Sequence, residues 1–242
     1  MSTLRSNLIE PLSGTTVTLG ASGDSVTVPA GATVKSNVLK DAGGNAIFTS
    51  NGSGTLSGVN SAIGGSMTFI SSLTASNSAA LEFTSGIDST YNEYQFWMIN
   101  ICPASANVHF KWQFSTNGGS SYGIATTNTV LEAYHVEADS NATVTYAANH
   151  DVAQSTSDVR LMAHMGSNAD SSGCGFVTLW HPSSTTYIKH FQSETNIDQS
   201  TDQDNFFTAG YINTTSAINA VKFYMSSGNV ESGSVYMYGI QG

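Results

Sequence analysis

Charge is scarce in this sequence, and positive charge is scarcest of all. Only 10% of the 242 residues are charged, and 7 Lys and Arg stand against 17 Asp and Glu, for a formal net charge of −10. Phosphate backbones and anionic lipids are bound by surfaces rich in Lys and Arg. We therefore expect neither nucleic-acid binding nor membrane insertion.

Long apolar runs are also missing. No stretch approaches the about 18 apolar residues that a membrane helix needs, and the opening MSTLRSNLIEPL has no apolar core of a secretory signal. Cys102 and Cys174 each lie in an apolar, strand-like run, where they could form a disulfide between neighbouring strands or stay as buried thiols. The absence of a signal favours free thiols.

What the sequence does contain favours strands and turns. Ser, Thr and Asn compete for the backbone hydrogen bonds of a helix, and Gly adds an entropic cost. The clearest strand is NVHFKWQF at residues 107–114, whose alternation points His109 and Lys111 to solvent and places Trp112 in the core. About a dozen such segments follow residue 67, separated by turns such as NGGSS. We predict an all-β chain in which residues 67–242 form an antiparallel, jelly-roll-like β-sandwich.

The first part of the chain has a different, more repetitive composition. Residues 14–38 contain several short runs of Val and Thr, and each run is followed by Gly, Ser or Pro. Fixing this backbone costs more free energy than its few aliphatic side chains return on burial, so residues 1–40 form a strip that does not fold alone. It is either a disordered tail or an extended β-repeat that stacks on copies of itself or on a larger surface, and its low charge favours stacking. The residues predicted to mediate oligomerisation and anchoring are Val17, Leu19, Val26, Val28, Val34 and Val38.

Between the strip and the sandwich, residues 41–66 are rich in Gly, Ser and Asn with isolated apolar residues. This composition is typical of a connector with room for one hairpin.

The sequence contains no recognisable catalytic motif. It has no G-x-S-x-G elbow, no H-E-x-x-H, no Walker A loop and no C-x-x-C. Its histidines are scattered singly, without ligand spacing to a nearby acid, which favours ordinary polar strand positions over a metal site or a catalytic base. They are His109, His135, His150, His164, His181 and His190.

Two acidic loops offer oxygen ligands at close spacing, which can suit Ca²⁺, but neither has the glycine and closing glutamate of an EF-hand. Their side chains are Glu137, Asp139 and Asn141 in EADSN, and Asp198, Asp202 and Asp204 in DQSTDQD. Acidic loops in an acidic protein are usually solvated, so we expect no metal and no cofactor. A paired-carboxylate glycosidase needs two acids at a set separation, and the acid-poor strands argue against one. We predict a protein that is not an enzyme.

Aromatic side chains are the remaining candidates for ligand contact. Outward-facing rings could form a sugar-stacking platform, but a sandwich this large needs bulky residues inside, so we expect Trp97 and Trp180 to fill the core. The candidates for glycan contact are Tyr91, Tyr94, Trp97, Trp180 and Tyr187.

Three stretches carry a family resemblance. They are LIEPLSGTTVTLGASGDSVTVPAGATV at residues 8–34, LEFTSGIDSTYNEYQFWMINICPASANVHFKWQFSTNGGSSY at 81–122 and GYINTTSAINAVKFYMSSGNVESGSVYMYGI at 210–240. The first resembles the virion-attachment region of tail-fibre and related structural proteins of tailed bacteriophages, especially cyanophages and other marine phages. The other two are similar to the C-terminal β-domain of virion structural proteins in such phages.

The resemblance implies a homotrimeric virion protein, assembled in the host cytoplasm, with no catalytic residues to transfer. Its N-terminal strip would be anchored to other virion proteins of the tail or capsid, and its sandwich would be displayed for contact with a host-surface glycan. We expect a tail fibre, with a capsid decoration or head-fibre protein as the alternative.

Two other hypotheses stay open, a stand-alone carbohydrate-binding or adhesion module and a β-sandwich glycan hydrolase. Exposed aromatics lining a groove would favour the first, and two carboxylates converging in a cleft would favour the second. An N-terminal strip ordered only against other chains would favour the virion protein.

Overall fold

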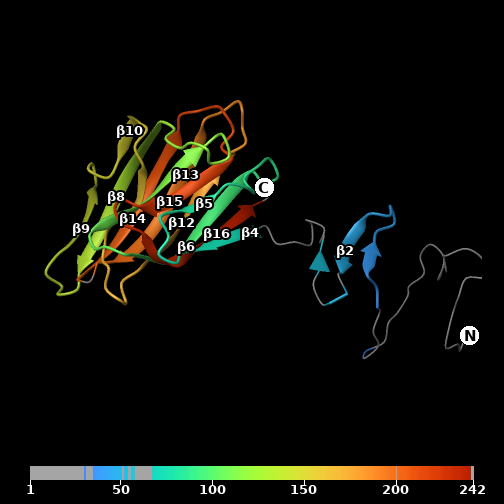
Figure 1. The fold of residues 1–242 in the computed structure, drawn as a ribbon, viewed down its shortest axis with the longest axis horizontal. Helices are drawn as coiled ribbons and strands as arrows, with labels where there is room; N and C mark the ends of the chain where they lie inside the picture. The colour runs from blue at the N-terminus through green and yellow to red at the C-terminus, as the bar shows by residue number, and fades with distance from the viewer. Residues whose placement is uncertain are drawn as a thin grey trace, which may run out of the picture. The chain divides into compact units, whose positions relative to one another are not determined.

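The computed structural model describes residues 30, 35–50, 52–53, 56–57, 67–199 and 201–240. The chain divides into two compact units, Met1–Ile63 and Gly64–Gly242. Every strand pairing in the described part of the chain is antiparallel, and none of its residues belongs to a helix that could span a bilayer (Figure 1).

The first unit contains a small three-stranded sheet in the order β1-β2-β3, made of Val38–Lys40, Ala46–Ser50 and Leu56–Ser57. Asp41 closes the turn between β1 and β2, because its carboxylate accepts hydrogen bonds from the backbone N–H and the side-chain amide of Asn45 at 2.8 and 3.1 Å. These bonds lower the pKa of Asp41. This sheet lies mainly in the segment that the composition suggests as a connector.

Five of the six aliphatic residues predicted to mediate anchoring lie outside the described residues. These are Val17, Leu19, Val26, Val28 and Val34. The sixth, Val38, begins β1 and is exposed.

The second unit is a β-sandwich, which confirms the all-β fold predicted from the sequence. Its larger sheet has nine strands in the order β10-β8-β14-β13-β12-β6-β16-β4, with β9 paired to β8. These strands are β4 Met67–Thr74, β6 Glu93–Pro103, β8 Thr126–Val136, β9 Ala142–Tyr146, β10 Val152–Ser155, β12 Gly173–Trp180, β13 Lys189–Asp198, β14 Asp202–Ile212 and β16 Val230–Ile240.

The smaller sheet has four strands in the order β11-β7-β15-β5. They are β5 Leu81–Phe83, β7 Val108–Ser115, β11 Val159–Met165 and β15 Ala220–Met225. The two sheets share one hydrophobic core, to which strands such as β7 and β13 contribute every second residue.

Aromatic rings fill the centre of this core. The ring centroid of Phe96, on the large sheet, lies 6.5 Å from that of Trp112 and 5.5 Å from that of Phe223, both on the small sheet. Trp112 and Phe223 stack at 5.8 Å, and all three side chains are fully buried. The core position predicted for Trp112 is confirmed.

Both cysteines are free thiols and half-buried. Burial raises the pKa of Cys102, with Glu231 adding to the effect. The Cys174 thiol accepts a hydrogen bond from the backbone N–H of Asn100 at 3.3 Å, where β6 departs from regular pairing.

Candidate functional site

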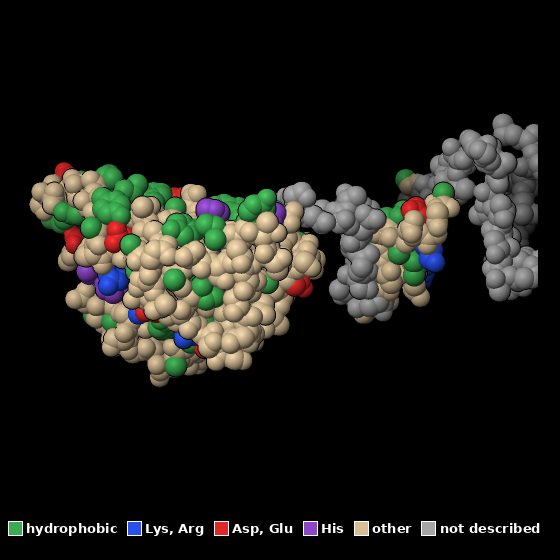
Figure 2. Space-filling view, turned by 90° about the horizontal axis from the view of Figure 1, so that it is seen from above, with side chains coloured by type: hydrophobic (Ala, Val, Ile, Leu, Met, Phe, Trp, Pro, Cys, Tyr) green, Lys and Arg blue, Asp and Glu red, His purple; other side chains and the backbone are tan. Residues whose placement is uncertain are grey.

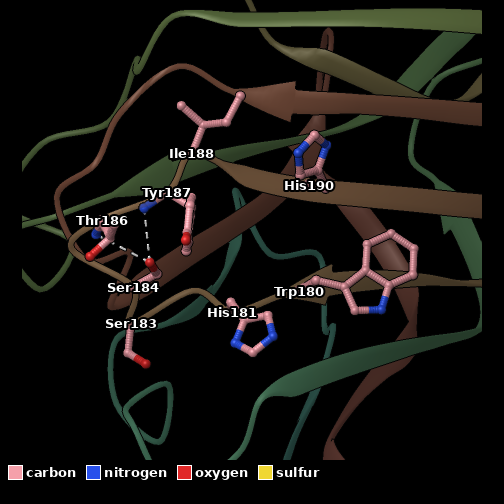
Figure 3. A pocket seen from close by; sticks show the side chains of 8 residues that line it. All are labelled: Trp180, His181, Ser183, Ser184, Thr186, Tyr187, Ile188 and His190. Atoms are coloured by element: carbon pink, nitrogen blue, oxygen red, sulfur yellow. Dashed lines mark hydrogen bonds between the residues drawn. The ribbon is translucent and has the colours of Figure 1, made fainter.

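The hairpin that joins β12 to β13 encloses a cavity of about 590 Å³. Trp180 ends β12, and His190 stands opposite it on β13. The connecting loop supplies most of the other walls. The cavity is lined by Trp180, His181, Ser183, Ser184, Thr186, Tyr187, Ile188 and His190 (Figure 3).

The first half of this loop is fixed by backbone hydrogen bonds. His181 adopts a positive φ of 45°, which turns the chain sharply out of β12. Its N–H donates to the carbonyl of Asn92 at 2.6 Å, and its own carbonyl accepts from the N–H of Ser184 at 3.0 Å. The carbonyl of Pro182 accepts from the N–H of Ile218 at 2.8 Å, so a second loop braces the first.

The second half of the loop is fixed by two side chains. The Ser184 hydroxyl accepts from the N–H groups of Thr186 and Tyr187 at 3.2 and 3.0 Å, as Figure 3 shows. The fully buried Lys189 ammonium donates to the carbonyls of Tyr187 and Thr214 at 3.2 and 3.1 Å, and burial lowers its pKa. The loop therefore holds its shape through internal bonds and needs no ligand to order it.

The cavity combines two aromatic rings with polar groups that converge on the same space. Trp180 is half-buried at one side, and Tyr187 is 73% exposed at the other. The imidazoles of His181 and His190 lie between them in Figure 3. A concave site with flat apolar faces and a few polar groups suits a small polar ligand with one apolar face, such as a sugar ring.

Trp180 and His190 also belong to the outer face of the large sheet. This face carries the exposed large hydrophobic residues of the sandwich apart from Tyr187, which are Met67, Phe69, Trp97, Ile99, Leu131, Val144, Tyr146 and Phe207. In Figure 2 hydrophobic side chains gather along one long margin of the sandwich, while most of the remaining visible surface is polar.

Trp97 is 41% exposed on this face, so the alternative that it fills the core is wrong. Its ring centroid lies 6.4 Å from that of Phe176 and 6.2 Å from that of Tyr238. β6 carries aromatic residues on both faces, and for this reason its alternation did not reveal which one faces solvent.

Two of the tyrosines predicted to contact glycan do not lie in the cavity. Tyr94 is fully buried, its hydroxyl accepts from the N–H of Asp88 at 2.9 Å, and burial raises its pKa. This burial corrects the prediction for Tyr94. Tyr91 is half-buried and packs edge-on against Tyr94 at 5.8 Å, over Gly239, where a Cβ would come within 2.2 Å of its ring. Of the five candidates, Trp180 and Tyr187 share the cavity, and Trp97 is exposed on the sheet face beyond it.

A second polar cluster lies beside the small sheet, where the β9–β10 loop that carries His150 meets β7 and β11. The rings of His109, His150 and His164 stand 5.1–5.6 Å apart, centroid to centroid. The Nδ1 of His109 accepts from the backbone N–H of His164, and the Nδ1 of His150 accepts from the Arg160 guanidinium. In the neutral state both rings therefore carry their proton on Nε2, which leaves neither Nε2 lone pair for a metal.

Burial and the nearby Arg160 lower the pKa of both His109 and His150 to about 4. Next to them, the Asp158 carboxylate accepts from the Lys111 ammonium and from the Tyr224 hydroxyl. Burial and this carboxylate raise the pKa of Tyr224. The charged and titratable groups of the small sheet are thus largely bonded to one another.

Asp202 and Asp204, predicted in a loop, lie at the start of β14 and line a cleft of about 310 Å³ together with Glu132. Burial and the charges of Glu132 and Asp202 raise the pKa of Asp204 to about 6. Its side chain lines this cleft but is bonded to the amide of Gln199, and the residue is only 2% exposed, so little of the carboxylate is open to a ligand. In the described part of the chain, no group of three or more His, Cys, Asp or Glu residues is arranged to hold a metal ion.

No family model, no curated protein and no solved structure matches the chain. Sequence reasoning found Trp180 and Tyr187 as aromatic candidates, but it missed His181, His190 and Ser184 as their partners in one cavity. The HPSSTTY run between two predicted strands marks a loop, and only the structure shows that this loop curls over the end of β12.

Proposed function

We propose that the chain is a structural protein of a bacteriophage virion that displays its β-sandwich for contact with a host-surface glycan. The observation that carries the glycan contact is the preformed cavity in which Trp180 and Tyr187 flank two imidazoles and several hydroxyl groups. The residues that line it include no carboxylate, so it offers a sugar a binding surface without the acid pair of a glycosidase.

The virion part of the proposal rests on the resemblance of residues 8–34, 81–122 and 210–240 to phage structural proteins, and on the division of the chain into two compact units. In this proposal residues 1–40 anchor the protein to the particle and bring three copies together. A tail fibre is the form we propose, with a capsid decoration or head-fibre protein as its alternative. A stand-alone adhesion module would use the same cavity without the anchor.

The glycan contact is tested with a printed panel of neutral linear oligosaccharides of glucose, galactose, mannose and N-acetylglucosamine. Trp180→Ala and Tyr187→Ala each remove one stacking face and should weaken binding about tenfold. Tyr146→Ala removes an exposed ring from β9, outside the cavity, and should leave binding unchanged. Binding that survives both cavity substitutions would contradict the proposal.

The anchor is tested by deleting residues 1–40. The truncated protein should remain folded and should fail to enter particles, measured by mass spectrometry of purified virions from cells that supply either form. Unfolding of the truncated protein would mean that the strip belongs to the sandwich. Incorporation of the truncated protein at the normal level would place the anchor elsewhere.

A further inference from the structure

The cavity opens onto a line of side chains along the outer face of the large sheet. Phe176, Thr178 and Trp180 occupy alternate positions of β12 and so project from the same face of the sheet. Trp97 stands opposite Phe176 on the neighbouring β6. Phe176 and Trp180 lie four positions apart, which is about 13 Å along an extended strand and too far for one sugar ring to touch both.

Two amide side chains lie between the two aromatic positions, over Thr178, which is only 4% exposed. Gln95 on β6 and Gln192 on β13 both stand opposite Thr178. The Gln95 amide nitrogen donates to the Thr178 hydroxyl at 3.2 Å, and its oxygen accepts from the Trp97 indole N–H at 2.6 Å. Gln192 is exposed.

These bonds fix the Trp97 ring before any ligand arrives. The polar N–H of the indole is occupied by Gln95, so what the ring presents to a ligand is its apolar surface. A ring that is already held in place loses less conformational entropy when it stacks on a ligand. The line therefore repeats the chemistry of the cavity, with an aromatic surface beside groups that can form hydrogen bonds.

The charges along this line exclude polyanions. Glu93 stands opposite Trp180, and Glu194 stands opposite Phe176. All four Lys and Arg residues of the sandwich lie elsewhere, since Lys189 is buried inside it and the other three lie on the small sheet, namely Lys111, Arg160 and Lys222. A second copy of the chain placed face to face would bring the same carboxylates without cations to pair them.

We propose that the cavity is the end subsite of an extended track that binds a neutral, linear oligosaccharide along β6 and β12. The track is defined by Trp180, Gln192, Gln95, Phe176 and Trp97. This inference rests on the proposed glycan contact at Trp180 and Tyr187, and it adds the class of ligand and a second stacking position at Trp97.

The test compares disaccharides with hexasaccharides of the neutral series that bind in the panel, by isothermal titration calorimetry on the full chain. Trp97→Ala should weaken hexasaccharide binding about tenfold and leave disaccharide binding unchanged, because only the longer ligand reaches the second ring. Trp97→Phe keeps an aromatic surface and should recover most of the affinity. Phe207→Ala, on β14 of the same face, serves as the matched control and should bind like the wild type.

The result separates the two proposals. If Trp180→Ala abolishes binding at every length while Trp97→Ala changes none, the glycan contact stands and the track is overturned. If no oligosaccharide binds, both are overturned. A hexamer of galacturonate that binds as tightly as the neutral hexasaccharides would overturn the neutral class. A change in sedimentation of Trp97→Ala would assign this face to self-association and also overturn the track.

Discussion

The two outer faces of the sandwich differ in how their side chains are used. On the small sheet, Lys111, Asp158 and Tyr224 are bonded to one another, and Arg160 is bonded to His150. On the large sheet, aromatic and aliphatic side chains remain exposed, and the indole N–H of Trp97 is satisfied by a neighbour on the same face.

This difference separates a structural face from a binding face. A network whose donors and acceptors are already paired has little to offer a ligand, and breaking one of its bonds leaves a polar group without its partner. An exposed aromatic surface contributes less to stability but gains by being covered. Substitutions on the small sheet should therefore lower the free energy of unfolding, and substitutions on the large sheet should mainly lower affinity.

The largest expected effect is the response to acid of the histidine cluster beside the small sheet. His109 and His150 have pKa values of about 4 in the folded protein, against about 6.5 in an unfolded chain, so the unfolded state binds these protons more readily. Their contribution to stability is complete above pH 6.5 and is lost as the pH falls from 6.5 to 4. The buried His150 accounts for a loss of about 3 kcal/mol, and the partly exposed His109 adds a smaller amount.

Urea unfolding at pH 7.0 and pH 4.5 measures this loss. The double variant His109→Asn with His150→Asn should show a flatter dependence on pH than the wild type, because the two titrating groups are gone. Equal losses in the wild type and the double variant would assign the acid sensitivity to other groups.

The next effect is the removal of the carboxylate in the small-sheet network. Asp158→Ala leaves the half-buried Lys111 ammonium and Tyr224 hydroxyl without this acceptor and should lower the free energy of unfolding by about 2 kcal/mol. Asp158→Asn retains an oxygen acceptor, so its free energy of unfolding should fall by less than that of Asp158→Ala. Glycan binding should be unchanged in both variants, and a loss of binding in either would contradict the division between the faces.

A smaller effect is expected where the cavity loop is anchored. Lys189→Met keeps the apolar stem of the side chain but leaves the carbonyls of Tyr187 and Thr214 without their donor. Stability should fall by about 1 kcal/mol, and binding of the neutral oligosaccharides should weaken about fivefold as Tyr187 loses its fixed position. Lys222→Met on the small sheet is the control and should bind normally.

The smallest effect should come from the exposed face of the large sheet. Leu131 is 47% exposed on β8, and Thr is a residue that favours strands. Leu131→Thr should therefore change the free energy of unfolding by no more than about 0.5 kcal/mol. The matched substitution Lys111→Thr on β7 should lower the free energy of unfolding by a larger amount, because it breaks the ion pair with Asp158. If urea unfolding showed the same loss of unfolding free energy in both variants, the distinction between the two faces would be wrong.

The sequence predicted the sandwich well where one face of a strand is apolar and the other is polar. The alternation in β7 predicted the buried position of Trp112 and the outward position of His109, and the structure confirms both. The short strand β10, with the sequence VAQS, has too few apolar residues to produce such a signal and was missed.

The candidate site was predictable only in part, because its geometry depends on contacts between distant segments. A lysine in a strand is expected to face solvent, yet Lys189 is fully buried with carbonyls from two loops around its ammonium. His109 and His150 are far apart in the sequence, and nothing in their spacing shows that their rings meet. Side-chain pattern predicts which elements form, whereas the site depends on how their ends are connected.

The neighbouring pair Phe96 and Trp97 has a consequence for how the sheet assembles. If β6 slid by one position, Trp97 would replace Phe96 in the core, but Glu93 and Gln95 would enter with it, so these polar neighbours rather than the rings favour the native frame. Two close contacts also help to fix the register. The Tyr94 hydroxyl accepts a hydrogen bond from the N–H of Asp88, and Gly175 has no side chain where a Cβ would lie 2.3 Å from the carbonyl oxygen of Glu194. A sheet with aromatic side chains on its outer face depends on polar neighbours and specific contacts of this kind to pair its strands in the correct register.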